Sequence, residues 1–359
     1  MKNTKLNILL LFFVPVLLFG HHKEGKFKKT KVIHHEYELN EHRNLHINNS
    51  YGNIHIINWD KNSIDIKVII NVDGDDATAV SKRINSIDIE LYESTHNIHA
   101  ITQIKSTQNS WNPISWVFGS SNNTHFKINY EIKIPASLNL NLVNEYGNLF
   151  IDKLDGKLDL NLSYGKFTIG ELLNDDNVIT TEYLSNSTID FIKGGALYSD
   201  YSKMYIQTAY KLKMTCDYAT IHIGDVRELQ FQNDYGSLKV DNVKIVTGSG
   251  DYQKRSFAQV DYLDFQGDYG SLHIDNLLPG FEKIQLQCDY TNIKIDNTEH
   301  VPYQLNISQS YGCFKQNGLT IYKEINDNGD KSIMGFYGDR NAGSSIKITE
   351  DYGCIKIYN

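Results

Sequence analysis

The residues best placed to do chemistry in this sequence are the acids that directly precede a series of tyrosines. In six successive tyrosine motifs the acid is aspartate: Asp200, Asp217, Asp234, Asp251, Asp268 and Asp289. A row of carboxylates suits hard cations, because Ca²⁺ binds several carboxylate and carbonyl oxygens. Aspartate also accepts backbone N–H bonds in turns. Because Ca²⁺ loops gather several acids in one turn, we expect turn capping and no resident cofactor, with Ca²⁺ as the alternative.

The tyrosines of these motifs recur along most of the chain. Most are separated by 17–21 residues, and the twelve copies are Tyr51, Tyr146, Tyr164, Tyr183, Tyr201, Tyr218, Tyr235, Tyr252, Tyr269, Tyr290, Tyr311 and Tyr352. Their rings could bind sugars, or they could stack on one another and stabilise the fold. Large exposed apolar surfaces are unusual in soluble proteins. We therefore expect stacking between the tyrosines and keep sugar binding as the alternative.

One motif carries charge where most of the others are apolar. Arg255 stands three residues after Tyr252, preceded by Lys254 and close to Asp251 and Asp268. A basic residue beside Ca²⁺-binding acids is the arrangement of a polysaccharide lyase. We expect instead a local bulge that turns Arg255 outward. Because the sequence also has no Ser-His-Asp, HExxH or glycine-rich phosphate motif, we predict a protein without enzymatic activity.

An aromatic segment between two predicted strands is the best single candidate for recognition. It contains Trp111, Trp116 and Phe118 within SWNPISWVFGSSNN (110–123). These side chains could form an exposed contact patch for a protein, a glycan or a membrane. They could equally fold back over the open end of the predicted β structure, and both interpretations stay open.

Apolar and polar residues alternate on both sides of each tyrosine, as in Ile221 and Ile223 after Tyr218. Alternation at period two is typical of strands with one buried face. The inward parity changes at the Tyr-Gly step, so we expect a bend there, at which glycine supplies backbone freedom or allows close approach. A unit of this length cannot bury its own apolar face, whereas stacked units can. The pattern therefore predicts an all-β parallel β-solenoid (β-helix) with 17–21-residue coils.

Other segments depart from this repeat. Residues 1–20 combine two lysines, an apolar run of twelve and Gly20, which is typical of a secretory signal peptide and too short to span a membrane. Residues 21–145 contain the first tyrosine motif, several alternating strands and a short helix near 75–85, and predict an N-terminal β-rich cap. The repeats then fill 146–359, with an excursion at about 320–344.

The cysteines fall into two pairs. Cys216 and Cys288 take inward positions four coils apart, too far to bond, and we expect them to be buried small side chains. Cys313 and Cys354 each stand two residues after a tyrosine. If the 320–344 stretch is an excursion, these two lie on adjacent coils about 4.8 Å apart, and we predict a disulfide between them.

Charge and export restrict the partners. The formal net charge of −8 argues against nucleic-acid binding, which needs a basic surface. We expect no transmembrane segment once the signal is removed. The protein is then expected in the periplasm, at the outer-membrane periphery or on the cell surface, where an envelope protein or a cell-surface glycan would be its partner.

Several stretches are similar to a known group of proteins. YGNIHIINWD (51–60), IKIPASLNLNL (132–142) and the repeated YG-x-Φ-x-Φ motif, where Φ is apolar, resemble the adhesin-like domain-of-unknown-function family of bacterial cell envelopes. The resemblance covers most of the mature chain. It implies a secreted right-handed β-helix, regarded as an adhesin by analogy, with no catalytic motif to transfer.

We therefore predict a non-enzymatic envelope protein, an adhesin or scaffold that presents a repetitive β-helix face to protein or glycan. The resemblance suggests one alternative, a periplasmic partner in envelope regulation. A polysaccharide lyase or hydrolase of the β-helix type is the other alternative.

Overall fold

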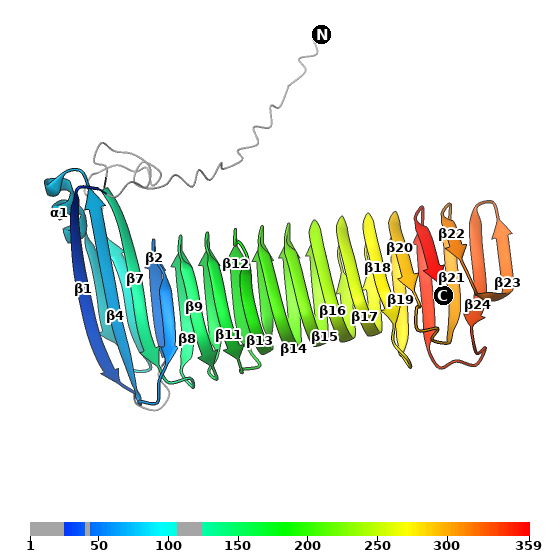
Figure 1. Cartoon of the computed structure of the whole chain (residues 1–359), viewed down its shortest axis with the longest axis horizontal. Helices are drawn as coiled ribbons and strands as arrows, with labels where there is room; N and C mark the ends of the chain where they lie inside the picture. The colour runs from blue at the N-terminus through cyan, green and yellow to red at the C-terminus, as the bar shows by residue number, and fades with distance from the viewer. Residues whose placement is uncertain (1–24, 40–43, 106–123) are drawn as a thin grey trace, which may run out of the picture.

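The chain folds almost entirely into β-strands. The computed structural model describes residues 25–39, 44–105 and 124–359, in which 26 strands form one hydrogen-bonded sheet that does not close on itself (Figure 1). One helix lies at its N-terminal end. Within these ranges no helix is long and apolar enough to cross a membrane. The predicted all-β class is confirmed.

The N-terminal region combines seven strands with the helix. Its elements are β1 (Phe27–Glu38), β2 (Asn44–Ser50), β3 (Ile54–Asn58), β4 (Ser63–Gly74), α1 (Ala77–Ser86), β5 (Ile87–Glu93), β6 (Asn97–Ile104) and β7 (Thr124–Ile134). β4 pairs antiparallel with both β1 and β7, and β5 pairs antiparallel with β6. Asp76 caps α1, because its carboxylate accepts the backbone N–H groups of Thr78 and Ala79. The helix expected near 75–85 is confirmed.

The remaining strands pair mostly in parallel. They are β8 (Asn139–Glu145), β9 (Asn148–Leu154), β10 (Leu158–Ser163), β11 (Lys166–Leu172), β12 (Asn177–Glu182), β13 (Ser187–Asp200), β14 (Lys203–Asp217), β15 (Thr220–Asp234), β16 (Gly236–Ser249), β17 (Gln253–Gln266), β18 (Gly270–Leu277), β19 (Lys283–Asp289), β20 (Thr291–Asp296), β21 (Tyr303–Ser310), β22 (Cys313–Gln316), β23 (Thr320–Asp327), β24 (Asp330–Tyr337), β25 (Ser345–Asp351) and β26 (Cys354–Tyr358). The strands that flank one tyrosine motif are called a rung below.

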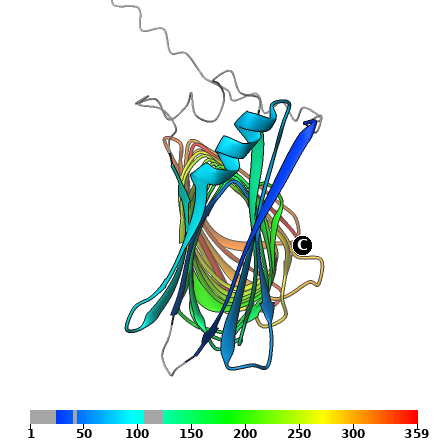
Figure 2. The ribbon, with the colours of Figure 1, turned by 90° about the vertical axis from the view of Figure 1, so that its left-hand side faces the viewer.

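Neighbouring rungs place the same position of the pattern side by side. Ile206 of β14 pairs with Ile223 of β15, which pairs with Val240 of β16. All three side chains are buried. Seen along the long axis, the strands surround an interior that a continuous set of apolar side chains fills (Figure 2). Inward alternation along each strand therefore becomes an apolar column along the whole molecule.

The bend between the two strands of a rung is made by the tyrosine itself. All twelve tyrosines of the motif have φ between 49° and 63°, which is the left-handed region. The sequence left open whether glycine supplies backbone freedom or allows close approach at this step, and Gly147 and Gly165 do not have positive φ. They are needed for close approach instead, because a Cβ on Gly147 would lie 1.8 Å from the carbonyl oxygen of Gly52 in the neighbouring rung.

The last rungs do not follow sequence order. β25 pairs in parallel with β19 on one side and with β21 on the other. The rung of Tyr352 therefore lies between those of Tyr290 and Tyr311, whereas the sequence suggested that the Tyr311 rung would come next. Residues 320–344, the proposed excursion, contain the antiparallel hairpin of β23 and β24. β24 also pairs with β21 and so covers its outer edge.

A glycine inside the stack provides a test of this close packing. Gly250 has a φ of 143°, and a Cβ there would lie 1.8 Å from the carbonyl oxygen of Asn233. We expect Gly250→Ala to lower the free energy of unfolding by about 2–4 kcal/mol, because two paired strands must move apart. Urea unfolding followed by circular dichroism measures this change.

Gly343→Ala is the matched control. A Cβ at Gly343 would meet nothing within 4 Å. This variant should change the free energy of unfolding by no more than about 0.5 kcal/mol. Equal losses in the two variants would contradict the proposed role of close packing.

Candidate functional site

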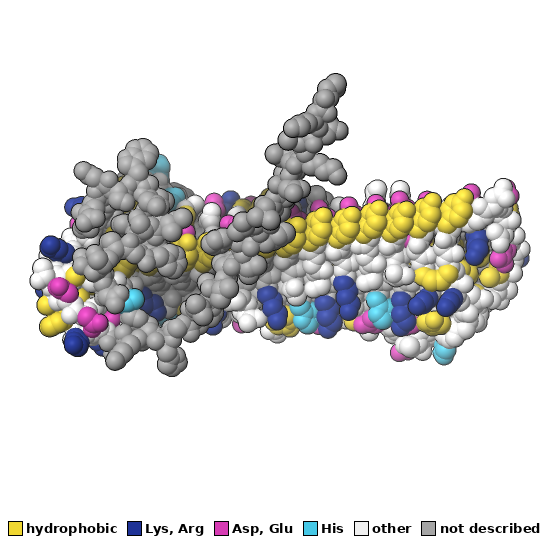
Figure 3. Space-filling view, turned by 90° about the horizontal axis from the view of Figure 1, so that it is seen from above, with side chains coloured by type: hydrophobic (Ala, Val, Ile, Leu, Met, Phe, Trp, Pro, Cys, Tyr) yellow, Lys and Arg dark blue, Asp and Glu magenta, His cyan; other side chains and the backbone are white. Residues whose placement is uncertain are grey.

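The twelve tyrosines form one continuous stack, which we call the tyrosine ladder. Successive rings have centroids 4.8–5.4 Å apart and planes within 13° of parallel. In spatial order the ladder contains Tyr51, Tyr146, Tyr164, Tyr183, Tyr201, Tyr218, Tyr235, Tyr252, Tyr269, Tyr290, Tyr352 and Tyr311. Figure 3 shows a long part of it as a stripe with acidic side chains along one side. The predicted stacking of the tyrosines is present.

The ladder exposes ring edges and hydroxyl groups rather than ring faces. Eleven of its tyrosines are 40–64% exposed, yet inside the ladder both faces of each ring are covered by neighbouring rings. A sugar ring therefore cannot lie flat on an internal tyrosine of the ladder. Burial and the nearby Glu145 raise the pKa of Tyr146 to about 12, so its hydroxyl stays protonated at neutral pH. The surface offered to a partner is a row of hydroxyls and aromatic edges.

Hydrogen bonds between rungs hold the tyrosine bends in place. The backbone N–H of Tyr218 donates to the carbonyl oxygen of Asp234 at 3.0 Å, and that of Tyr235 donates to Asp251 at 3.1 Å. The same bond recurs along the ladder, from the tyrosine of one rung to the residue before the tyrosine of the next. A left-handed residue other than glycine costs about 1–2 kcal/mol. The bond and the ring stack offset this cost at each rung.

The six aspartates beside the ladder also bond between rungs. The carboxylate of Asp234 accepts the backbone N–H of Asp251 at 2.7 Å, and that of Asp251 accepts the N–H of Asp268 at 2.8 Å. Asp200 and Asp268 accept in the same way from the aspartate of the next rung. Burial, and then the neighbouring carboxylates, raise the pKa of Asp217. These aspartates cap the bend, although the N–H groups that they bind lie in the adjacent rung.

The aspartates do not gather into a metal cage. Among the residues that the structure places, no group of three or more His, Cys, Asp or Glu side chains could hold a metal ion. The six carboxylates are spread along the axis instead, one to a rung. A Ca²⁺ site would need several oxygens at one point.

Arg255 points into the interior, and the expectation that it turns outward is wrong. Its side chain is fully buried, and its guanidinium lies 4.3 Å from the centre of the Phe265 ring. Nη2 donates to the carbonyl oxygen of Gly250, while Nε and Nη1 have no hydrogen-bond partner in the described part of the chain. Burial lowers the pKa of Arg255 to about 10, so the group stays charged at neutral pH.

Missing side chains in two rungs make room for Arg255. The position two residues before the tyrosine holds Asn233 and Cys288 in flanking rungs but Gly250 and Gly267 in between. Lys254, by contrast, is exposed. Adjacent side chains on a strand point to opposite faces, so Lys254 and Arg255 cannot converge on one substrate. The arrangement of a polysaccharide lyase is not formed at this rung.

Replacing the buried charge tests whether Arg255 stabilises the rungs around it. We expect Arg255→Met to raise the free energy of unfolding by about 1–3 kcal/mol, because it removes two unpaired buried donors and a desolvated charge. Leu272 takes the same position in the next rung, and Leu272→Met should cost less than about 1.5 kcal/mol. Chemical denaturation compares the two variants. A clear loss of stability in Arg255→Met would show that attraction to the aspartates outside outweighs desolvation.

Glu350 is a second buried charge, near the C-terminal end. It is fully buried; Oε1 accepts the backbone N–H of Thr291 at 3.0 Å, and Oε2 has no hydrogen-bond partner among the described residues. Burial is the main cause that raises the pKa of Glu350 to about 8, and Asp289 and Asp351 add to it. At neutral pH the carboxyl is mostly protonated.

The raised pKa makes stability depend on pH. Because the folded pKa of Glu350 exceeds its unfolded value of about 4.3, its contribution is full below that value and is lost as pH rises towards 8. Glu350→Gln mimics the neutral form, so we expect it to match the parent near pH 4 and to be about 1–3 kcal/mol more stable at pH 8.5. Thermal unfolding at several pH values measures this difference in stability, the gap between the variant and the parent. A gap that does not change with pH, or the same gap in the exposed control Glu299→Gln, would disprove this explanation.

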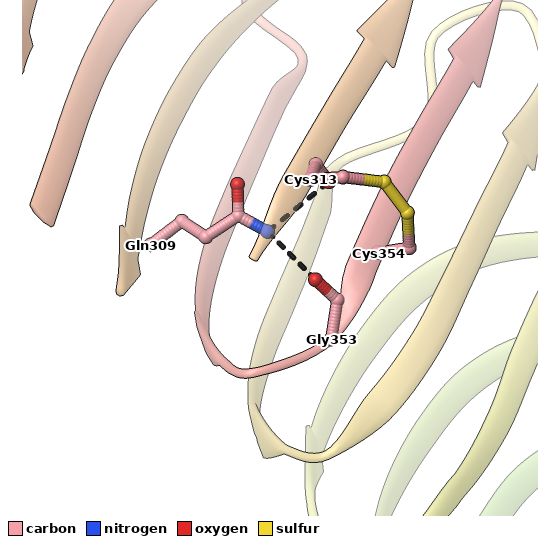
Figure 4. The surroundings of a disulfide bond; sticks show 4 residues. All are labelled: Gln309, Cys313, Gly353 and Cys354. Atoms are coloured by element: carbon pink, nitrogen blue, oxygen red, sulfur yellow. Dashed lines mark hydrogen bonds between the residues drawn. A yellow bond between two sulfur atoms is a disulfide. The ribbon is translucent and has the colours of Figure 1, made fainter. Parts of the chain in front are cut away.

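A disulfide joins the last two rungs at the C-terminal end of the stack, those of Tyr311 and Tyr352. Cys313 and Cys354 are bonded, with Cα atoms 4.6 Å apart and a sequence separation of 41 (Figure 4). Gln309 supports the bond from the interior, where its Nε2 donates to the carbonyl oxygens of Cys313 and Gly353. A loop of this length corresponds to about 4 kcal/mol on a chain-entropy estimate. Cys216 and Cys288 are free and buried.

Two grooves were not predicted from the sequence. One of about 850 Å³ extends across the rungs beside Lys211, Lys213 and Gln230. The other, of about 650 Å³, passes beside Tyr210 and Arg227. Both lie near the middle of β14–β16, between one tyrosine and the next, where the alternation of buried and exposed side chains breaks and the strand pairing skips a residue. We call this point the second bend of a rung. In the sequence, the grooves are marked by a break in the period-two alternation, as at Tyr210 and Lys211. Both of these side chains are exposed in the structure.

Two predicted segments lie outside the described residues. Trp111, Trp116 and Phe118 belong to 106–123, and the predicted signal peptide belongs to 1–24. The aromatic contact patch therefore stays a prediction.

Comparison with known proteins gives weak similarities. No protein-family model matches the chain, and no curated protein is significantly similar in sequence. Among solved structures, a proposed adhesin from Parabacteroides distasonis has a TM-score of 0.33 at 9% identity, covering 91% of this chain and 97% of its own. A proposed adhesin from Parabacteroides merdae gives 0.32 at 9%, covering 94% and 98%. A proposed lipid-binding protein from Parabacteroides distasonis gives 0.27 at 10%, covering 93% and 98%. TM-scores this low show neither a shared fold nor a shared function.

Proposed function

We propose that the chain is a non-enzymatic scaffold of the bacterial cell envelope, of the adhesin type, whose partner is an envelope protein or a cell-surface glycan. The tyrosine ladder is the observation that carries this proposal. It repeats the same aromatic and hydroxyl groups at twelve rungs, and at eleven of them the tyrosine side chain is about half exposed. Tyrosine suits contact surfaces, because it offers a large rigid apolar area and a hydroxyl together.

We further propose that the strands wind as a right-handed parallel β-solenoid with one rung per turn. Parallel pairing at matching positions of β13–β17 supports this winding. Parallel strands joined by crossovers are almost always right-handed. Such a rod would be rigid along its axis, because each rung is hydrogen-bonded to its neighbours.

The site chemistry favours binding over catalysis. The two basic residues that suggested a lyase lie on opposite faces of the same strand, with Arg255 buried and Lys254 exposed. The acids beside the ladder are engaged in backbone hydrogen bonds between rungs. A long repetitive surface without a converging pair of catalytic groups suits an extended partner.

A pull-down from cross-linked whole envelopes tests the proposal. We expect the protein to retain a specific partner, with or without Ca²⁺, and the double variant Tyr218→Asn, Tyr235→Asn to retain about tenfold less. Asparagine tolerates positive φ, so the bends should survive. Circular dichroism and thermal unfolding check that they do.

The control replaces exposed tyrosines that are not in the ladder. Tyr198 and Tyr205 are 44% and 39% exposed. Tyr198→Asn with Tyr205→Asn should leave retention unchanged. Equal retention by both folded double variants would exclude the ladder as the contact surface. Loss of binding in EDTA would show that the contact needs a divalent cation.

A further inference from the structure

The 650 Å³ groove has a regular construction over three adjacent rungs. Each rung contributes three consecutive residues, namely Thr208–Tyr210, Asp225–Arg227 and Asn242–Lys244. Strand pairing places Thr208 beside Asp225 and Asp225 beside Asn242. The groove therefore runs along the long axis of the molecule, across the strands.

The floor of the groove is apolar and its two walls are polar. The middle residues, Ala209, Val226 and Val243, are 3–4% exposed and form the floor. One wall consists of the first residue of each triplet, and the other wall of the third. Neighbouring rungs are about 4.8 Å apart, so each wall offers a hydrogen-bonding group at that interval.

A loop closes one end of the groove. Leu278, Pro279 and Gly280 line it there. The loop arises because the interval from Tyr269 to Tyr290 is 21 residues, whereas the four preceding intervals are 17. The backbone N–H of Glu282 donates to the Asp261 carboxylate at 3.0 Å, which ties the loop to the groove wall.

The walls carry both signs of charge together with neutral donors and acceptors. Asn242 donates to the Asp225 carboxylate at 2.8 Å, which leaves its amide oxygen for a ligand. Arg227 lies 4.8 Å from the centre of the Tyr210 ring and donates to the Tyr210 hydroxyl at 2.5 Å. The two acids of the lining, Asp225 and Asp261, balance its two bases, Arg227 and Lys244. A polyanion or a polycation would meet like charges, whereas a neutral ligand rich in hydroxyls would find both donors and acceptors.

We propose that this groove binds one linear, neutral polysaccharide chain that lies along the axis, with its hydroxyl groups on the two polar walls. The rise per residue of an extended sugar polymer is close to the spacing between strands, so successive sugars would meet successive rungs. The Pro279 loop would stop the chain at one end. This inference rests on the proposed scaffold function, for which it names a ligand class.

Isothermal titration with β-1,4-linked hexamers of glucose and of N-acetylglucosamine tests the groove. We expect saturable binding of at least one hexamer by the full chain. Asp225→Ala with Asn242→Ala should weaken it about tenfold, the effect of losing about 1.4 kcal/mol. Both side chains are exposed, so the fold should be kept, and thermal unfolding confirms this.

The control variant lies on the other side of the same bend. Gln230→Ala with Thr247→Ala alters the 850 Å³ groove and should bind the hexamer as tightly as the parent. Three results would each overturn the proposal. They are weaker hexamer binding in this control variant alone, tighter binding of oligogalacturonate than of the neutral hexamers, and no binding of either hexamer. If the chain still retains an envelope partner through the tyrosine ladder in that case, the scaffold function stands and only the groove assignment falls.

Discussion

The structure depends on one constraint, which is that every rung bends at the same place as its neighbours. The bend puts a tyrosine in the left-handed region at each of twelve rungs. A single residue in this conformation is unfavourable, but stacking makes the twelve bends support one another. The ring of each tyrosine lies on the next ring, and its N–H bonds to the next rung. A side chain that cannot stack would leave the unfavourable bend without this compensation.

The same constraint explains where the pattern can vary. Inside the stack, a side chain is accommodated only if it packs without clash against the side chains at the same position in the two neighbouring rungs. Arg255 is accommodated because Gly250 and Gly267 leave the adjacent positions empty. Glu350 stays neutral at pH 7 for a related reason, because it is buried among the carboxylates of the bends. Exceptions inside are therefore local adaptations of packing, and they are poor candidates for ligand binding.

How far the sequence predicts this structure depends on how local each feature is. The alternation around Tyr218 predicts strands, and the acids at 75 and 76 predict the start of α1, because both signals lie within one or two elements. The burial of Arg255 could not be predicted from its own rung, because it depends on two glycines of which one is 12 residues away. The position of the Tyr352 rung depends on the β23–β24 hairpin, which lets the chain return between two earlier rungs. The groove depends on side chains 17 residues apart that only strand pairing brings together.

The two bends of a rung differ in a way that bears on recognition. At the tyrosine bend nearly identical groups repeat, so a partner bound there would gain the same contact at every rung and could slide from rung to rung. At the second bend the outward residues change from rung to rung, from Tyr210 to Arg227 to Lys244. A ligand bound there would have one preferred register, which the loop at Pro279 would fix further. Repetition can supply avidity at the first bend, while specificity needs the sequence variation that only the second bend provides.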